Sequence, residues 1–184
     1  MVPTTEHKKM TYAEYLKIDD NKRYEILEGE LKMVPAPSTE HQSVSRNIGF
    51  LMWDFVKEKG LGVVFCAPID VVLDDDLVLQ PDIVYIKEEN KNIIDQNAIK
   101  GIPDLVVEIV SPSSTFCDTV EKKEIYRKYG VMEYWLVFPD EKVIELFYLE
   151  KGEYIEFCRS KKRGVVQSRI LMRLKIDAED AFET

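Results

Sequence analysis

One short segment constrains the fold of this 184-residue chain more than any other. Residues 105–110, LVVEIV, are apolar except for Glu108, and Pro103-Asp104 and a Ser-Pro-Ser-Ser turn bound the run. A strand with one face in water alternates polar and apolar residues, whereas a strand covered on both faces is apolar throughout. The segment therefore predicts a central strand with layers of structure packed on both of its sides.

Two longer segments have the apolar spacing of helices. Residues 38–60 place apolar side chains at steps of three and four, and residues 117–129 repeat that spacing before Gly130. Ser38 is a suitable residue to begin the first helix, and Gly60 and Gly130 are suitable residues to end the two helices. A shorter helix is expected at 10–18, where Thr11 can cap the first turn.

Most of the remaining chain has the pattern of short strands. Residues 23–34 form a hairpin around Gly29, and further strands are expected at 63–65, 69–73, 77–86, 133–138, 143–148, 154–157 and 165–166. Residues 87–101 are polar and predict a surface loop or ragged helix, and 176–182 predict a brief final helix. The sum is an α+β fold, one mixed sheet flanked by two main helices, in a single domain over 1–184, because no linker divides the chain.

Charge and composition exclude several classes of protein. The chain has 25 basic and 34 acidic residues, a formal net charge of −9. This balance argues against binding nucleic acid through bulk electrostatics, although a localised basic groove stays compatible with it. Three cysteines without zinc-type spacing predict reduced thiols, and the absence of a Gly-rich phosphate loop argues against a nucleotide cofactor. The polar N-terminus and the lack of a long apolar run predict a soluble, cytoplasmic protein that has no membrane partner.

Two acidic residues interrupt segments that are otherwise apolar. Asp82 lies in LVLQPDIVYI and Glu108 in PDLVVEIVSPSS. If these strands pair, the two carboxylates converge into a site for Mg²⁺ or Mn²⁺, with the backbone carbonyl of Ile109 as a third ligand. The alternative is structural, with Asp82 accepting local backbone hydrogen bonds and Glu108 pairing with an arginine in the core.

A third candidate lies on the helix over 117–129. Asp118, Lys122 and Tyr126 are four residues apart and share one helix face, so Lys122 has an acidic partner and can extend toward the sheet. The alternative is a surface ion pair between Asp118 and Lys122, which contributes only a few tenths of a kcal/mol.

Taken in order, QPDIVYI, PDLVVEIVSPSS and the segment from Asp118 to Trp135 resemble a large family of small prokaryotic proteins described as putative restriction endonucleases. The resemblance extends to YEILEGEL and to the helix around His41, and so covers nearly the whole chain. It implies a restriction-endonuclease-like fold within the PD-(D/E)XK nuclease superfamily. That superfamily usually has a lysine two residues after its second acid, where this chain has Val110.

The resemblance also implies a function and the residues that perform it. Asp82 and Glu108 match the two acids that hold Mg²⁺ or Mn²⁺, and Lys122 matches a lysine moved to the following helix. The implied activity is hydrolysis of DNA phosphodiester bonds, with Lys122 orienting or deprotonating the attacking water. The missing lysine at position 110 and the acidic charge favour an alternative, a non-catalytic module of the same fold that binds nucleic acid or protein.

Further residues and partners are implied less directly. Glu30, or else Glu28, on the hairpin would complete the carboxylate shell. His41 would either contact a phosphate at the N-terminus of its helix or cap and pack that helix. DNA is the implied substrate, and a homodimer is expected because many nucleases pair to cut two strands.

Overall fold

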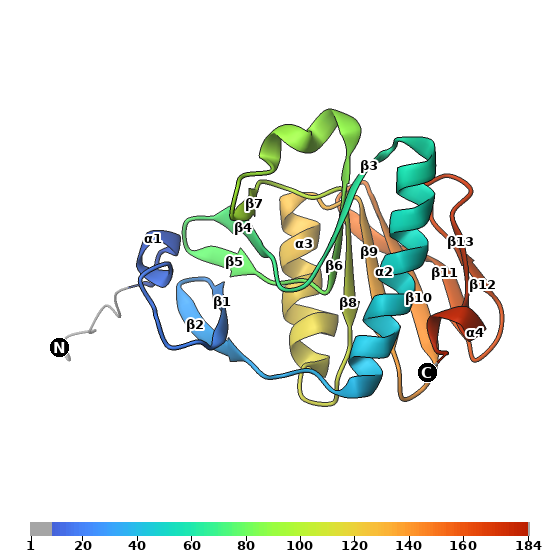
Figure 1. Cartoon of the computed structure of the whole chain (residues 1–184), viewed down its shortest axis with the longest axis horizontal. Helices are drawn as coiled ribbons and strands as arrows, with labels where there is room; N and C mark the ends of the chain where they lie inside the picture. The colour runs from blue at the N-terminus through green and yellow to red at the C-terminus, as the bar shows by residue number, and fades with distance from the viewer. Residues whose placement is uncertain (1–8, 184) are drawn as a thin grey trace.

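The computed structural model describes residues 9–183 as an α+β arrangement of helices and three sheets (Figure 1). The helical segments are α1 Tyr12–Tyr15, α2 Thr39–Lys59, the 3₁₀ helix η1 Glu88–Ile93, the π-helix η2 Cys117–Lys122, α3 Lys123–Tyr129 and α4 Ala178–Ala181. The two main helices expected from the sequence are α2 and the continuous pair η2–α3, so the predicted α+β class is confirmed.

The strands form two large sheets and one small sheet rather than the single mixed sheet expected. The six-stranded sheet has the order β11-β10-β9-β8-β6-β3, with β3 Gly62–Cys66, β6 Ile83–Lys87, β8 Leu105–Ile109, β9 Glu133–Phe138, β10 Val143–Glu150 and β11 Glu153–Lys161. The five-stranded sheet has the order β2-β1-β5-β4-β7, with β1 Arg23–Leu27, β2 Glu30–Val34, β4 Asp70–Asp74, β5 Leu77–Leu79 and β7 Ala98–Lys100. Strands β12 Val165–Gln167 and β13 Lys175–Asp177 form the third sheet.

The two large sheets divide at Pro81. The sequence predicted one strand over 77–86, but β5 ends at Leu79 and β6 begins at Ile83. Proline has no backbone N–H to donate to a sheet ladder, which disfavours a continuous central strand here. Strand β5 pairs with β1 and β4, whereas β6 pairs with β3 and β8. Asp82 therefore lies at the junction of the two sheets and not inside a strand.

Strand β8 lies at the centre of the fold, as predicted. It runs antiparallel to β6 and parallel to β9, and all five of its residues are buried. Leu105, Val107 and Ile109 pack in the cluster that includes the buried face of α2, while Val106 packs in the cluster that includes Tyr126 of α3. In Figure 1, α2 lies in front of β8 and α3 behind it. Strand alternation places Glu108 on the same face as Val106, toward η2 and α3.

The predicted caps set where α2 begins and ends. Ser38 is the N-cap, and its side-chain oxygen accepts a hydrogen bond from the His41 N–H at 3.1 Å. Gly60 ends the helix in the left-handed conformation, with φ of 62°. Since the cap fixes the first turn, it also fixes His41 at the end of α2 nearest Asp82.

Several smaller elements differ from those expected from the sequence. Strands β7 and β13 were not predicted, and the expected final helix over 176–182 is the shorter α4. Cys66, Cys117 and Cys158 are free thiols, as predicted. No helix of the described residues is long and apolar enough to cross a membrane.

Candidate active site

The pairing of β6 with β8 brings the two acidic segments together. Ile83 lies opposite Val107, and the backbone N–H of Ile109 donates to Asp82 Oδ2 at 2.8 Å. Asp82, Glu108 and Ile109 all line one pocket of about 280 Å³. The strands pair, as the metal-site hypothesis requires, and both Asp82 and Glu108 line a shared cavity.

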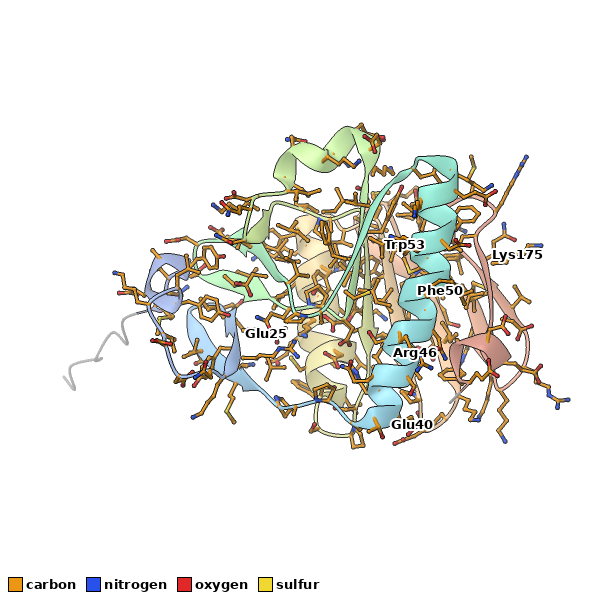
Figure 2. All side chains as sticks on the ribbon, viewed as in Figure 1. Glu25, Glu40, Arg46, Phe50, Trp53 and Lys175 are labelled. Carbon is orange, nitrogen blue, oxygen red and sulfur yellow. The ribbon has the colours of Figure 1, made fainter. Side chains whose placement is uncertain are left out.

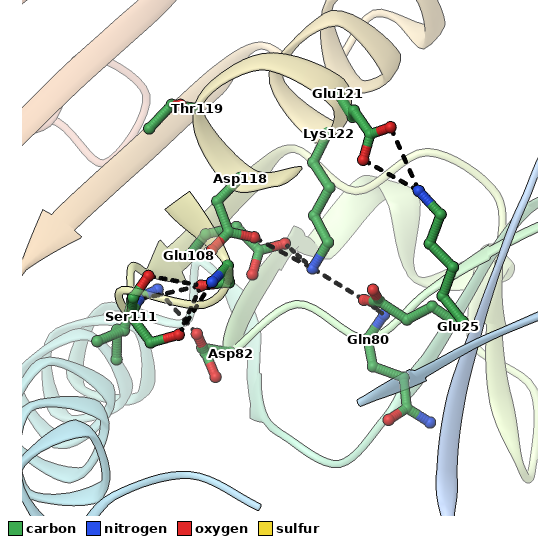
Figure 3. A network of polar contacts seen from close by, with 12 residues as sticks. Glu25, Gln80, Asp82, Glu108, Ser111, Asp118, Thr119, Glu121 and Lys122 are labelled. Carbon is green, nitrogen blue, oxygen red and sulfur yellow. Dashed lines mark hydrogen bonds and ion pairs between the residues drawn. The ribbon is translucent and has the colours of Figure 1, made fainter. Parts of the chain in front are cut away.

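Lys122 extends from η2 into the same pocket. Its Nζ lies 2.9 Å from Glu25 Oε1, 3.2 Å from Glu108 Oε1 and 3.5 Å from Asp118 Oδ1 (Figure 3). Lys122 is only 6% exposed. The alternative of a surface ion pair with Asp118 is therefore excluded, because the ammonium group is buried among three carboxylates.

The hairpin contributes an acid to this cluster, but the acid is Glu25. Glu30, at the start of β2, is exposed and lines a different pocket together with Glu28. Glu25 on β1 is 5% exposed, and its Oε1 also accepts the backbone N–H of Gln80 at 2.8 Å. The signal that sequence reasoning missed is strand alternation, because Glu25 shares a strand face with Leu27, which is buried.

Burial raises the pKa of Glu108, and the charges of Asp118, Asp82 and Glu25 raise it further against the opposing effect of Lys122. The Tyr126 hydroxyl donates to Glu108 Oε1 at 3.0 Å, so one carboxylate oxygen receives both the phenol and the lysine. The core partner of Glu108 is thus a lysine and a tyrosine rather than the arginine considered from the sequence.

The charge on Lys122 is stabilised despite its burial. Burial alone would lower the pKa of its ammonium group, but Glu108, Glu25 and Asp118 outweigh that effect and raise the pKa well above its usual value. Burial raises the pKa of the Asp118 carboxyl. At neutral pH, Lys122 is a fixed positive charge in a pocket that otherwise disfavours ionisation.

His41 contacts Asp82 from the first turn of α2. Its Nε2 lies 3.3 Å from Asp82 Oδ2, and both side chains are 14% exposed. Burial would lower the pKa of His41, but the hydrogen bond and charge of Asp82 outweigh burial and raise it. Nδ1 is buried without a hydrogen-bond partner among the described residues. His41 therefore contacts Asp82 through Nε2, while its Nδ1 is enclosed by the protein.

The donor set suits a hard cation. Glu25, Asp82, Glu108 and Asp118 contribute four carboxyl groups to the pocket, against the two cations Lys122 and Arg23. The acids outnumber these two cations, and burial raises the pKa of Glu108 and Asp118, so both carboxyl groups lack sufficient counter-charge to ionise freely. Carboxylate and carbonyl oxygens are the ligands that Mg²⁺ and Mn²⁺ prefer. In the part of the chain that the structure describes, no three His, Cys, Asp or Glu side chains form a ready-made metal cluster.

The arrangement of the elements matches that of a solved protein. The crystal structure of a protein from Anabaena variabilis, described as a "putative nuclease" of a domain family of unknown function, superimposes with a TM-score of 0.77. The two chains are 21% identical, and the match covers 94% of this chain and 97% of the other. The two proteins therefore share a fold. No curated protein matches this chain.

The family follows from the sequence itself. Residues 12–172 match the model of the Uma2 family, described as "Putative restriction endonuclease". The chain belongs to this family, as the resemblance had indicated. The matched segment includes every residue of the cluster around Lys122.

Proposed function

We propose that this protein is a Mg²⁺-dependent nuclease that hydrolyses DNA phosphodiester bonds. Asp82 and Glu108 would hold the ion, with the backbone carbonyl of Ile109 as a third ligand, and Mn²⁺ would substitute for Mg²⁺. The observation that carries this proposal is the convergence of four carboxyl groups, those of Glu25, Asp82, Glu108 and Asp118, on one pocket that contains only the cations Lys122 and Arg23. Buried carboxylates that lack enough internal counter-charge are costly, and a divalent cation is the ligand that would neutralise them.

Each residue of the pocket then has a distinct role. Bound Mg²⁺ supplies a Lewis acid that polarises the phosphoryl oxygen and lowers the pKa of a water molecule. The ammonium of Lys122 orients the attacking water and offsets negative charge that develops on the phosphate. Glu25 and Asp118 hold the lysine in position from two directions, since each lies within 3.5 Å of its Nζ. His41 holds the Asp82 carboxylate through Nε2.

Cleavage assays test this proposal. We expect the purified protein with Mg²⁺ or Mn²⁺ to cut single-stranded, duplex or branched DNA, and we expect Asp82→Asn and Glu108→Gln to remove the activity. Lys122→Met should lower the rate by about 10²–10³-fold, the usual effect of losing one preorganised electrostatic group. Glu30→Gln, which changes an acid outside the pocket, is the matched control and should retain full activity. DNA that stays intact equally with the native protein and the variants would overturn the proposal for those substrates.

A second candidate is a binding module of the same fold without catalysis. One observation favours it, namely that Lys122 already contacts three of the four carboxylates. Calorimetric titration with Mn²⁺ distinguishes the two candidates. Binding that is lost in Glu108→Gln supports the nuclease, whereas no heat of binding at millimolar Mn²⁺ supports the module.

A further inference from the structure

An exposed stripe of four side chains runs along α2, outside the site described above. It consists of Arg46, Phe50, Trp53 and Lys57, which recur at steps of four, three and four residues and so lie on one helix face. Phe50 is 59% exposed and Trp53 is 43% exposed. Figure 2 shows Arg46, Phe50 and Trp53 following one another along the helix. At 1.5 Å per residue, the stripe is roughly 16 Å long.

The aromatic rings of the stripe are accessible and grouped. The ring centroids of Phe50 and Trp53 are 6.3 Å apart, and Lys57 Nζ lies 4.4 Å from the centroid of the Trp53 ring. Arg46 and Lys57 are exposed, and neither forms an ion pair with a carboxylate within residues 9–183; the Arg46 guanidinium donates to Asn47 Oδ1 at 3.1 and 2.9 Å. Two neighbouring exposed rings and two cations that lack a carboxylate partner match the features by which proteins bind single strands of nucleic acid, although a base that stacks on Trp53 has to displace Lys57 or use the other ring face.

A second copy of this chain fits the stripe less well. In an antiparallel two-fold pairing, Phe50 would pack against Trp53 of the other copy. Arg46 precedes Phe50 by four residues and Lys57 follows Trp53 by four, so the same pairing would place Arg46 against Lys57 of the other copy. A parallel pairing would place each cation against its own equivalent. Within the stripe, both symmetric arrangements oppose like charges, whereas a polyanion complements them.

The position of the stripe connects it to the pocket. Ser38 and His41 in the first turn of α2 line the pocket, and Arg46 follows His41 by five residues, so the stripe begins roughly 7.5 Å along the helix from the pocket, on a different helix face. Asp54 and Glu58 flank the stripe on one side of the helix. Bases of a duplex are already stacked on one another, whereas an unpaired strand leaves its bases free to stack on Phe50 and Trp53.

We propose that the Arg46–Phe50–Trp53–Lys57 stripe binds unpaired DNA and leads it to the pocket, so that the substrate of this site is single-stranded DNA. The part of this inference that concerns the substrate rests on the proposed function. Binding of DNA by the stripe does not depend on whether the pocket cuts DNA. The binding and cleavage steps therefore need separate measurements.

Tryptophan fluorescence offers a direct readout of binding. The chain has two tryptophans, and Trp135 is fully buried, so quenching by a ligand on the surface would come from Trp53. We would titrate a twelve-nucleotide oligothymidylate into the intact protein in EDTA, because removal of divalent ions prevents cleavage during the titration. Binding should quench the fluorescence, and a matched duplex should bind more weakly.

Single substitutions give the expected magnitudes. Phe50→Ala should weaken binding by about 5- to 150-fold, the effect of losing one base-stacking contact. Arg46→Gln and Lys57→Gln should each reduce the slope of log K against log salt by about 0.7, since each removes one phosphate contact to a single strand. Asp54→Asn should tighten binding, because it removes a negative charge beside the stripe. Ile155→Ala on β11, an exposed apolar side chain elsewhere that is 48% exposed, is the control and should change nothing.

The outcomes separate this inference from the proposed function. Quenching that is lost in Phe50→Ala, together with absent cleavage, would support the stripe and overturn the nuclease. Cleavage whose KM and kcat are the same in Phe50→Ala and in the native protein would overturn the stripe and keep the nuclease. Sedimentation velocity completes the test, because a dimer that dissociates on Phe50→Ala would identify the stripe as an interface between copies and would also overturn the inference.

Discussion

Replacing Lys122 by methionine gives the most direct test of the electrostatics of the pocket. Methionine keeps most of the volume of the side chain but removes the ammonium group. Three carboxylates, those of Glu25, Glu108 and Asp118, then lose the cation that each contacts at 2.9–3.5 Å. All three acids are buried, with exposures of 3–5%. Water therefore replaces little of the lost interaction.

The magnitude follows from the cost of leaving a buried charge without its partner. Removing one member of a buried ion pair costs about 3–5 kcal/mol of unfolding free energy. In a domain of this size, 1 kcal/mol shifts Tm by roughly 2–4 °C, so Lys122→Met should lower Tm by roughly 6–20 °C in EDTA. Lys128, on the same helix but exposed, is the matched control, and Lys128→Met should change the unfolding free energy by less than about 0.5 kcal/mol.

Urea denaturation measures the loss of unfolding free energy in Lys122→Met, and the same measurement with added Mn²⁺ tests whether the pocket binds the ion. Without the ammonium, the pocket has one more unit of negative charge, so Mn²⁺ should stabilise the Lys122→Met variant more than the native protein. A ligand at one hundred times its Kd adds about 2.7 kcal/mol. A loss below about 1 kcal/mol in EDTA would refute the reasoning, since it would mean that the three acids do not depend on Lys122.

Two further predictions concern single hydrogen-bonding groups. Tyr126→Phe removes the donor to Glu108 Oε1, so a buried acceptor loses a partner, and the unfolding free energy measured in urea should fall by about 1–3 kcal/mol. Tyr129→Phe is the control. It removes an exposed contact and should lower the unfolding free energy by less than about 0.5 kcal/mol. Glu133 is fully buried, and burial raises the pKa of its carboxyl against four opposing hydrogen bonds. The folded state therefore binds a proton that the unfolded state has released, so the contribution of Glu133 to the unfolding free energy should fall as pH rises from about 4.5 through the raised pKa. Glu133→Gln should remove this pH dependence, and an unchanged pH profile would contradict the argument.

Local patterns in the sequence were sufficient to predict much of this molecule. The apolar run around Glu108 specified a strand covered on both faces, because burial on two sides requires continuous apolarity. The spacing of Asp118, Lys122 and Tyr126 placed all three on one face, and the structure turns that face toward Glu108. These features depend on residues close together in the chain.

The features that sequence analysis missed depend on distant pairings. The apolar residues on both sides of Pro81 read as one strand, and only the separate partners of β5 and β6 show that the chain changes sheets there. Glu25 and Glu30 are both acids on one hairpin, and the side on which the hairpin meets β5 decides which of them faces the pocket. Strand alternation puts Glu25 on the face of the apolar Leu27, but only the pairing of β1 with β5 shows that Glu25 reaches the pocket.

The acidic net charge of the chain is compatible with DNA as the proposed substrate when the positions of the charged residues are considered. The pocket is rich in acids, so a phosphodiester entering it without a cation would meet Glu25, Asp82, Glu108 and Asp118, with Lys122 and Arg23 as the cations that compensate them. A divalent ion held by these acids would favour their ionised forms and supply positive charge at the position where a phosphate would bind. Away from the pocket, attraction for DNA would need only a few unneutralised cations, since affinity depends on the phosphates contacted and not on the total charge of the protein. With a net charge of −9, the proposed binding of DNA would depend on few contacts and would weaken as salt is added.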